Sequence, residues 1–183
     1  MNWFDILTQA VGFAGALFFF ISFQVKANRP LFVLQTLGCV CFCVQFALLG
    51  AYSGCLSLFL SIVRNIMLTR YTSSRVVRWR GWVYLFSGCT LALALFTWDG
   101  WISLLPAAGA IAGTFGYWSN NARKIRLANL LVTSPCLLTY DVIVGSWGGA
   151  LNETVVILSI VISIVRFGWA ALDGDQVAAS QKK

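Results

Sequence analysis

Seven apolar runs separated by short polar segments divide the chain. They cover residues 4–23, 31–50, 54–69, 82–96, 101–118, 127–144 and 150–171. A helix needs ~20 residues to cross a hydrocarbon core of ~30 Å, with ~17–25 the usual range. Five runs meet this length, and the runs 54–69 and 82–96 meet it with a few interfacial residues added. Because an open sheet would leave backbone groups unsatisfied in lipid, the pattern predicts an all-α membrane protein with seven transmembrane helices.

Composition supports a membrane protein rather than a soluble one. Hydrophobic residues make up 59% of the 183 residues, and charged residues only 10%, against roughly 25% charged residues in soluble domains. The first 15 residues contain no Lys or Arg, so we expect no cleaved signal peptide. The lipid bilayer is therefore the first partner that the sequence predicts.

The basic residues predict how the chain is oriented. Eleven of the 13 lie in the segments after the first, third and fifth runs and in the C-terminal tail: Lys26, Arg29, Arg70, Arg75, Arg78, Arg80, Arg123, Lys124, Arg126, Lys182 and Lys183. The positive-inside rule then places the N-terminus outside and the C-terminus in the cytoplasm. The net charge of +7 is thus a topology signal dispersed over short loops, which argues against nucleic acid as a partner.

A short glycine-containing motif occurs twice. GAYSGCL at Gly50–Leu56 and GSWGGAL at Gly145–Leu151 are identical at three of seven positions and lie 95 residues apart. Shifting the chain by that distance places the second and third runs on the sixth and seventh, and a shift of 97 places the first run on the fifth. This predicts a 3+1+3 parallel repeat, in which an unpaired helix keeps both three-helix bundles in one orientation.

The repeat divides the chain into four parts. We expect a first three-helix repeat at 1–71, a basic loop and linker helix at 72–99, a second three-helix repeat at 100–171, and a polar cytoplasmic tail at 172–183. Parallel repeats of this kind are a transporter architecture with the binding site between the halves. Small residues on the first and fifth runs would let helices approach closely at that seam: Gly12, Gly15, Gly109, Gly113 and Gly116.

Several weak motifs together resemble one family. They are LQ at Leu34–Gln35, F-x-L-L-G-x-Y at Phe46–Tyr52, RN at Arg64–Asn65, R-x-x-N at Arg126–Asn129, Y-D before V-x-x-G-S at Tyr140–Ser146, and the later Glu153 and Arg166. This pattern resembles the YgjV family of bacterial inner-membrane proteins over nearly the whole chain. The resemblance implies a multi-pass protein of the bacterial inner membrane.

That family is similar in architecture to the SWEET, PQ-loop and PnuC transporters. The SWEET and PQ-loop proteins share the three-plus-one-plus-three plan with an outside N-terminus, and the resemblance implies the same SWEET-like plan here. The Pro-Gln pair that gives the PQ-loop group its name is absent from the first run, which ends FISFQVKANRP. The SWEET rocking mechanism and sugar preference are therefore not carried over to this chain.

Polar residues inside the runs are the candidate site, because an ionisable side chain in a membrane is costly and by default a functional hypothesis. Arg64 lies ten residues, roughly 15 Å, from Gly54 and hence near mid-membrane. We expect the two copies of the glycine-containing motif to be the extracellular corners of the two halves. Asp141 and Glu153 lie about one turn inside the second corner, where they can face each other. The candidate substrate-binding residues are Gln35, Ser57, Arg64, Asn65, Tyr140, Asp141, Asn152 and Glu153.

Two interpretations of these charges remain open. Arg64 could bind a polar or anionic solute while the carboxylates line the outer mouth and exchange protons, or Arg64 could pair with a carboxylate and fix helix register. Pro106 and Pro135 lie within the fifth and sixth runs and are expected to bend them. Pro135 is either a gating hinge or a static kink.

The chain contains few of the residue patterns that are typical of catalytic sites. The chain has no histidine, and its six cysteines fall in or beside the runs at a spacing that does not form a metal clip. We predict no catalytic residue, no metal and no cofactor, and we do not expect the protein to be an enzyme. The leading hypothesis is a small facilitator or proton-coupled carrier for a small polar solute, and the alternative is a non-transporting receptor or a subunit of a larger complex. The solute, the coupling ion and whether the protein is a homo-oligomer stay open.

Overall fold

The computed structural model describes residues 3–48, 52–98, 100–144 and 147–173. Within these ranges the chain is helical and contains no strand, so the all-α prediction is confirmed. The duplicated corner motif falls partly outside them, because residues 49–51 and 145–146 are not described. The prediction of two equivalent extracellular corners therefore lies outside the described residues.

Each of the seven apolar runs corresponds to one helical segment, and two segments combine more than one helix type. The first four helices are α1 (Trp3–Phe23), α2 (Asn28–Leu48), α3 (Tyr52–Thr69) and α4 (Gly81–Phe96). A 3₁₀ turn, η1 (Trp101–Ser103), then leads into α5 (Leu104–Trp118). The sixth segment combines α6 (Ala122–Ala128), the π-helical turn η2 (Asn129–Thr133) and α7 (Ser134–Val144), and α8 (Trp147–Phe167) is the last.

Within the part of the chain that the structure describes, three helices are long and apolar enough to cross a membrane by themselves. The qualifying stretches are Ile6–Phe23 in α1, Asn28–Leu48 in α2 and Gly148–Phe167 in α8. Shorter apolar stretches, Ser57–Thr69 and Gly81–Phe96, lie in α3 and α4. Membrane crossing by the other predicted spans stays a prediction, and so does the complete seven-span topology.

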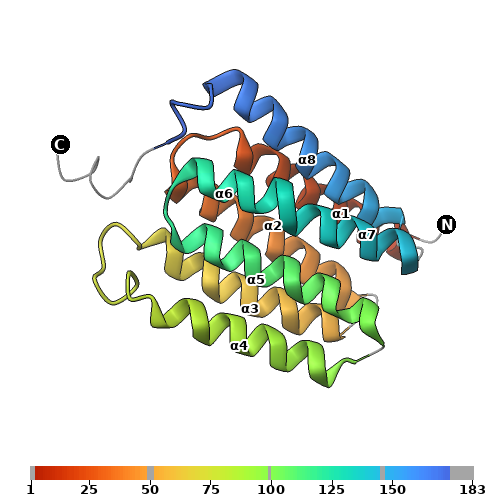
Figure 1. Ribbon diagram of the computed structural model, residues 1–183. Helices are drawn as coiled ribbons and strands as arrows, with labels where there is room; N and C mark the ends of the chain where they lie inside the picture. Colours follow the sequence, from red (N-terminus) through yellow and green to blue (C-terminus); the bar gives the residue numbers. More distant parts are fainter. Residues whose placement is uncertain (1–2, 49–51, 99, 145–146, 174–183) are drawn as a thin grey trace.

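The helices pack as two groups (Figure 1). In the first group, α2 packs against both α1 and α3, and in the second group α7 packs against both α5 and α8. Helix α1 also contacts α8, which joins the groups. Helix α4 contacts α5 more extensively than α3 and lies at the edge of the bundle.

The buried core lies toward one end of the bundle. At this end α1, α3, α5 and α8 terminate and α2, α4 and α6 begin; we call it the basic end, because Lys26, Arg75, Arg80 and Lys124 lie in or beside its connections. The core cluster is formed by Phe23, Leu31, Phe32, Leu68, Val83, Phe86, Tyr117, Trp118, Ile125, Val156 and Ile160. The outward faces remain apolar, with Leu17 58% and Val165 79% exposed, as expected for surfaces that face lipid.

The largest differences from the expected boundaries are at the start of the sixth segment and at the end of the last one. The sixth segment begins at Ala122 rather than 127, because the Asn121 side chain caps the helix by accepting bonds from the backbone N–H groups of Arg123 and Lys124. The last helix ends at Phe167 rather than 171. Gly168 follows it with a φ of 79°, the left-handed conformation that commonly terminates helices.

The two prolines do not act in the same way. Pro106 is the third residue of α5 and follows the 3₁₀ turn η1, so its missing N–H removes no hydrogen bond within α5. The expected bend of the fifth run stays a prediction. Pro135 is the second residue of α7, just after the π-helical turn η2. The wider turn leaves space for the proline ring, which would clash with the carbonyl four residues earlier in a regular helix. Hinge motion at Pro135 stays a prediction.

Candidate functional site

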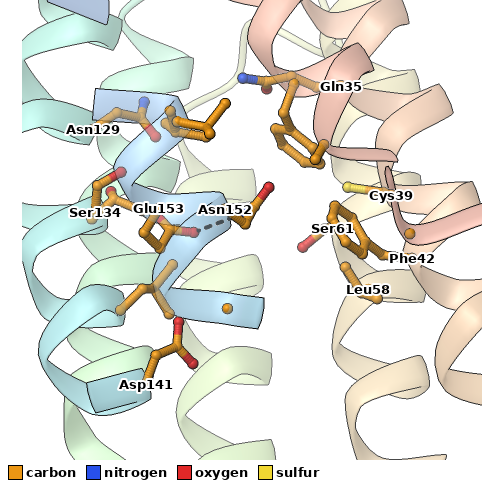
Figure 2. A pocket seen from close by; sticks show the side chains of 18 of the residues that line it. Gln35, Cys39, Phe42, Leu58, Ser61, Asn129, Ser134, Asp141, Asn152 and Glu153 are labelled. Carbon is orange, nitrogen blue, oxygen red and sulfur yellow. Dashed lines mark hydrogen bonds between the residues drawn. The ribbon is translucent and has the colours of Figure 1, made fainter. Parts of the chain in front are cut away.

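A cavity of about 690 Å³ lies between the two groups of helices. Its walls come from α1, α2 and α3 on one side and from α5, η2, α7 and α8 on the other, whereas no described residue of α4 lines it. Figure 2 shows Ser61 and Asn152 pointing into this space from opposite groups. The lining includes the exposed residues Gln9 and Gly148 near the end opposite the basic end.

The structure brings most of the predicted site residues together. Six of the eight line the cavity, namely Gln35, Arg64, Asn65, Asp141, Asn152 and Glu153. Ser57 and Tyr140 do not line it, and neither does the candidate hinge Pro135. Ser57 is exposed on α3, and Ser61, one turn further along that helix, lines the cavity in its place. Whether any of these residues binds a solute stays a prediction.

Arg64 is held by neutral groups. Its Nη1 donates to Thr114 Oγ1 over 3.0 Å and its Nε donates to Asn65 Oδ1 over 3.3 Å. Its Cζ lies 4.8 Å from the centre of the Tyr117 ring, a cation–π arrangement. Among the described residues Arg64 makes no ion pair. The interpretation in which Arg64 pairs with Asp141 or Glu153 is therefore wrong for this structure.

Several buried polar atoms along the cavity lack a partner. Gln35 is 1% exposed, and its carboxamide approaches the Tyr117 hydroxyl without reaching hydrogen-bond geometry. Ser134 Oγ, also in a residue 1% exposed, approaches the Glu153 carboxylate without reaching hydrogen-bond geometry, and Asn152 Oδ1 has no hydrogen-bond partner in the described structure. Native proteins leave few buried polar groups unsatisfied. Their convergence on one cavity indicates a place for water or a polar ligand.

The α7–α8 wall of the cavity carries both carboxylates. Asp141 lies directly against Gly149, where a Cβ atom would come within 2.6 Å of the carboxylate carbon. Glu153 lies one helical turn further along α8, beside Ser134, and its Oε1 accepts from Asn152 Nδ2 over 3.3 Å (Figure 2). The glycine of the second corner motif therefore leaves room for the Asp141 side chain.

The α1–α2 wall is largely aromatic. Phe13 and Phe19 of α1 and Phe42 and Phe46 of α2 line the cavity, and the rings of Phe19 and Phe42 are 6.0 Å apart. A Cβ atom at Gly38 would lie 2.7 Å from the Phe19 ring. The close approach of these helices thus depends on glycine, and it gives the cavity an apolar wall opposite an acidic one.

Arg126 closes the cavity toward the basic end. Its side chain is completely buried. Its Nη2 donates to the backbone carbonyls of Phe23 and Val25, both over 2.8 Å, and its Nε donates to Ser163 Oγ over 2.8 Å. These bonds tie the end of α1 to α6 and α8. A cation at a helix C-terminus is also favoured by the helix dipole.

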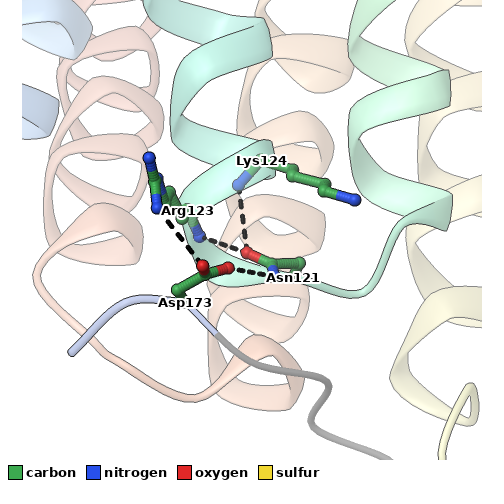
Figure 3. A network of polar contacts seen from close by, with 4 residues as sticks. All are labelled: Asn121, Arg123, Lys124 and Asp173. Carbon is green, nitrogen blue, oxygen red and sulfur yellow. Dashed lines mark hydrogen bonds and ion pairs between the residues drawn. The ribbon is translucent and has the colours of Figure 1, made fainter. Parts of the chain in front are cut away.

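Further bonds between the groups reinforce this closed end. Gln24 Nε2 donates to the carbonyl and the hydroxyl of Ser159, both over 2.9 Å. Asn28 Nδ2 donates to the Asn120 carbonyl over 2.6 Å. Side chains near the start of α6 also fix the segment after α8, since Arg123 pairs with Asp173 over 3.2 Å and Asn121 donates to the same carboxylate (Figure 3).

Sequence reasoning missed part of the lining and most of the closed end. Gln9, Ser61, Asn129, Thr133 and Ser134 line the cavity although they were not predicted to do so. Arg126 was interpreted as a loop charge, and its burial was not expected. The R-x-x-N pattern contained the available signal, because Arg126 and Asn129 lie one turn apart on the same helix. Among the described residues no group of three or more candidate metal ligands occurs.

The fold and the cavity define a helical membrane protein with a polar interior between two groups of helices. The chain belongs to the Imp-YgjV family: the sequence model of this family, described as a bacterial inner membrane protein, matches residues 6–170. The family resemblance predicted from the motifs is therefore confirmed. The family description also agrees with the predicted location in the bacterial inner membrane. Comparison with curated proteins gives no match, and neither does comparison with solved structures. The likeness to SWEET, PQ-loop and PnuC transporters stays a prediction.

Proposed function

We propose that this protein is a small carrier that moves a small polar solute across the bacterial inner membrane. The observation that carries the proposal is the cavity of about 690 Å³, whose polar lining comes from both groups of helices and not from α4. A site between two helical halves is the arrangement expected of transporters built from repeats. A cavity of this size is typical of small-molecule sites.

The proposed architecture explains why α4 stands apart. We take 1–71 and 100–171 as two three-helix units in the same orientation, and 72–99 as the linker whose helix restores that orientation. The N-terminus would then be periplasmic and the C-terminus cytoplasmic, in agreement with the positive-inside rule. In this frame the basic end faces the cytoplasm, and the structure is a state in which the solute site is closed on that side.

The proposed mechanism is alternating access. Because Arg126, Gln24 and Asn28 hold the closed end together by hydrogen bonds between the groups, release of these bonds would open the cavity to the cytoplasm. Arg126 makes no ion pair within the described residues, so opening would exchange its hydrogen bonds to neutral acceptors for hydrogen bonds to water. Carriers of this kind need two states separated by only a few kcal/mol.

Two-sided access to the cavity tests the proposal without knowledge of the solute. In a protein freed of its six cysteines, Ser61→Cys places a thiol in the cavity wall, and Ser73→Cys places one in the exposed basic loop as a matched control. A membrane-impermeant maleimide is applied to right-side-out and to inverted vesicles. For a carrier we expect Ser61→Cys to react from both sides and Ser73→Cys only from the cytoplasmic side.

The same experiment separates the alternative function. A receptor or a subunit of a larger complex has no need to open at both ends. Reaction of Ser61→Cys from a single side, at equal total labelling in detergent, would contradict transport and favour such a module.

A further inference from the structure

The cavity carries opposite charges at two places. Arg64 projects from α3 on the side of the first group, and Glu153 projects from α8 on the side of the second group. The two do not form an ion pair. Each is accompanied by a buried polar atom that lacks a hydrogen-bond partner. The cavity therefore offers a donor pole and an acceptor pole to one ligand.

The donor pole suits a carboxylate. Arg64 uses Nε and Nη1 for Asn65 and Thr114, and the structure assigns no partner to its Nη2 within the described residues. The Gln35 carboxamide, also unpartnered and 1% exposed, lines the same cavity. A guanidinium and an amide nitrogen together supply charge-assisted donors, which bind carboxylates more strongly than neutral donors do.

The acceptor pole suits an ammonium group. Glu153 supplies a carboxylate, Ser134 Oγ lies beside it short of hydrogen-bond geometry, and Asn152 Oδ1 is a buried acceptor without a partner in the described structure. Figure 2 shows Glu153 between Ser134 and Asn152 on the α7–α8 wall. An ammonium group has three donors and no acceptor, so the acceptor oxygen atoms of this wall suit it. Asp141 lies further along the same wall and would attract such a cation toward the mouth.

The separation of the poles fits a small molecule. Tyr117 stacks under Arg64 at 4.8 Å, and its hydroxyl donates to Asn129 Oδ1 over 3.2 Å, so Arg64 stands near the level of Asn129. Ser134, at the level of Glu153, is five residues further along the same segment, across the π-helical turn η2, so the two poles lie at different levels of the cavity. A cavity of about 690 Å³ accommodates a small molecule between them.

We propose that the cavity binds a small zwitterion of the amino-acid type. Its carboxylate contacts Arg64 and Gln35, its ammonium group contacts Glu153, Asn152 and Ser134, and an apolar side chain packs against the phenylalanine wall of α1 and α2. This inference names the solute class for the proposed function. Transport of the zwitterion rests on that function, but its binding can be measured separately.

Ligands that each lack one charge test the proposal on the unmodified protein. The protein in lipid nanodiscs is titrated by calorimetry with L-leucine, 3-methylbutylamine and 4-methylpentanoate, and with the corresponding trios derived from L-valine and L-phenylalanine. We expect at least one zwitterion to bind, and its amine and its acid to bind about 10- to 100-fold more weakly, as for loss of a hydrogen bond to a charged group.

Other results overturn the proposal. An amine that binds as tightly as its amino acid indicates a site for organic cations, and an acid that does so indicates a site for anions. Absence of binding by every zwitterion at about 10 mM, a concentration that would saturate a millimolar site, also overturns it.

Variants assign the two poles. Arg64→Gln should make the protein bind the amino acid and the amine that lacks its carboxylate with similar affinity. Glu153→Gln should make it bind the amino acid and the acid that lacks its ammonium group with similar affinity. Arg166→Gln is the matched control for the arginine, because Arg166 is exposed, contacts Phe167 and does not line the cavity; its ligand preference should equal that of the wild type. If Arg64→Gln retains the full preference, the assignment of the carboxylate to Arg64 is wrong.

This test can fail without the proposed function failing. Two-sided labelling of Ser61→Cys together with no zwitterion binding would keep the carrier and remove this class of solute. One-sided labelling together with selective zwitterion binding would keep the ligand and indicate a receptor.

Discussion

Arg64 and Arg126 are two arginines of the helical bundle that have opposite surroundings. Arg126 is completely buried, and its hydrogen bonds with carbonyls and a hydroxyl join three helices. Arg64 is half-buried, keeps part of its guanidinium free of bonds within the described residues, and lines a cavity with other unsatisfied groups. A satisfied buried cation holds structure together, whereas an incompletely satisfied one beside a cavity indicates a place for a ligand.

The largest effect is expected at the satisfied arginine. Arg126→Ala should lower the free energy of unfolding by about 3–5 kcal/mol, because the carbonyls of Phe23 and Val25 and the hydroxyl of Ser163 lose their donor, at about 1–3 kcal/mol each where they stay buried. Thermal unfolding in detergent measures the change. Arg166→Ala, at an exposed position, is the control and should change stability by less than about 0.5 kcal/mol. Equal effects of the two variants would show that Arg126 does not close the bundle.

An intermediate effect on stability is expected from a glycine substitution in the second group of helices, compared with a control glycine in α4. A Cβ atom at Gly116 would lie 2.5 Å from the Ala128 Cβ, so Gly116→Ala should destabilise the protein by about 1–3 kcal/mol through overpacking. A Cβ atom at Gly88 in α4 meets nothing within 4 Å, and Gly88→Ala should stabilise the helix by about 0.5–1 kcal/mol. Melting temperatures that move in the same direction for both would contradict the packing of α5 against α6.

The smallest effect on stability is expected at the unsatisfied arginine. Arg64→Gln should change the free energy of unfolding by less than about 1 kcal/mol, since no carboxylate is left without its partner, and the helix remains intact. Thermal unfolding and ligand titration are measured on the same preparation. A fall in melting temperature comparable to that of Arg126→Ala, with ligand binding unchanged, would show that Arg64 is structural and that the comparison between the two arginines fails.

The sequence predicts the helices well and the cavity in part. Long apolar runs define seven helical segments, because a 20-residue apolar run allows few other structures in lipid. Gln35, Arg64, Asn65, Asp141, Asn152 and Glu153 were correctly grouped, since polar residues within apolar runs turn away from lipid.

The features that the sequence did not predict depend on how each helix is rotated about its own axis and on the local geometry of the backbone. Ser57 and Ser61 are both hydroxyl residues on α3, and only packing decides which one lines the cavity. Ser134 faces the cavity after the π-helical turn η2, whose extra rotation cannot be derived from an apolar run. Arg126 lies one residue before the predicted span, and its burial follows from the earlier start of α6 at the Asn121 cap.

Opening of the basic end is the central claim, and a distance measurement by pulsed electron spin resonance tests it most directly. One pair of spin labels replaces Arg29 of α2 and Lys124 of α6, both exposed near the basic end, and a second pair replaces Leu7 of α1 and Val142 of α7 at the opposite end. We predict two distances for each pair, one for the open and one for the closed state of that end. Arg126→Ala should favour the longer distance at the basic end and the shorter distance at the opposite end. A single unchanged distance for both pairs, in the parent protein and in the Arg126→Ala variant, would contradict alternating access.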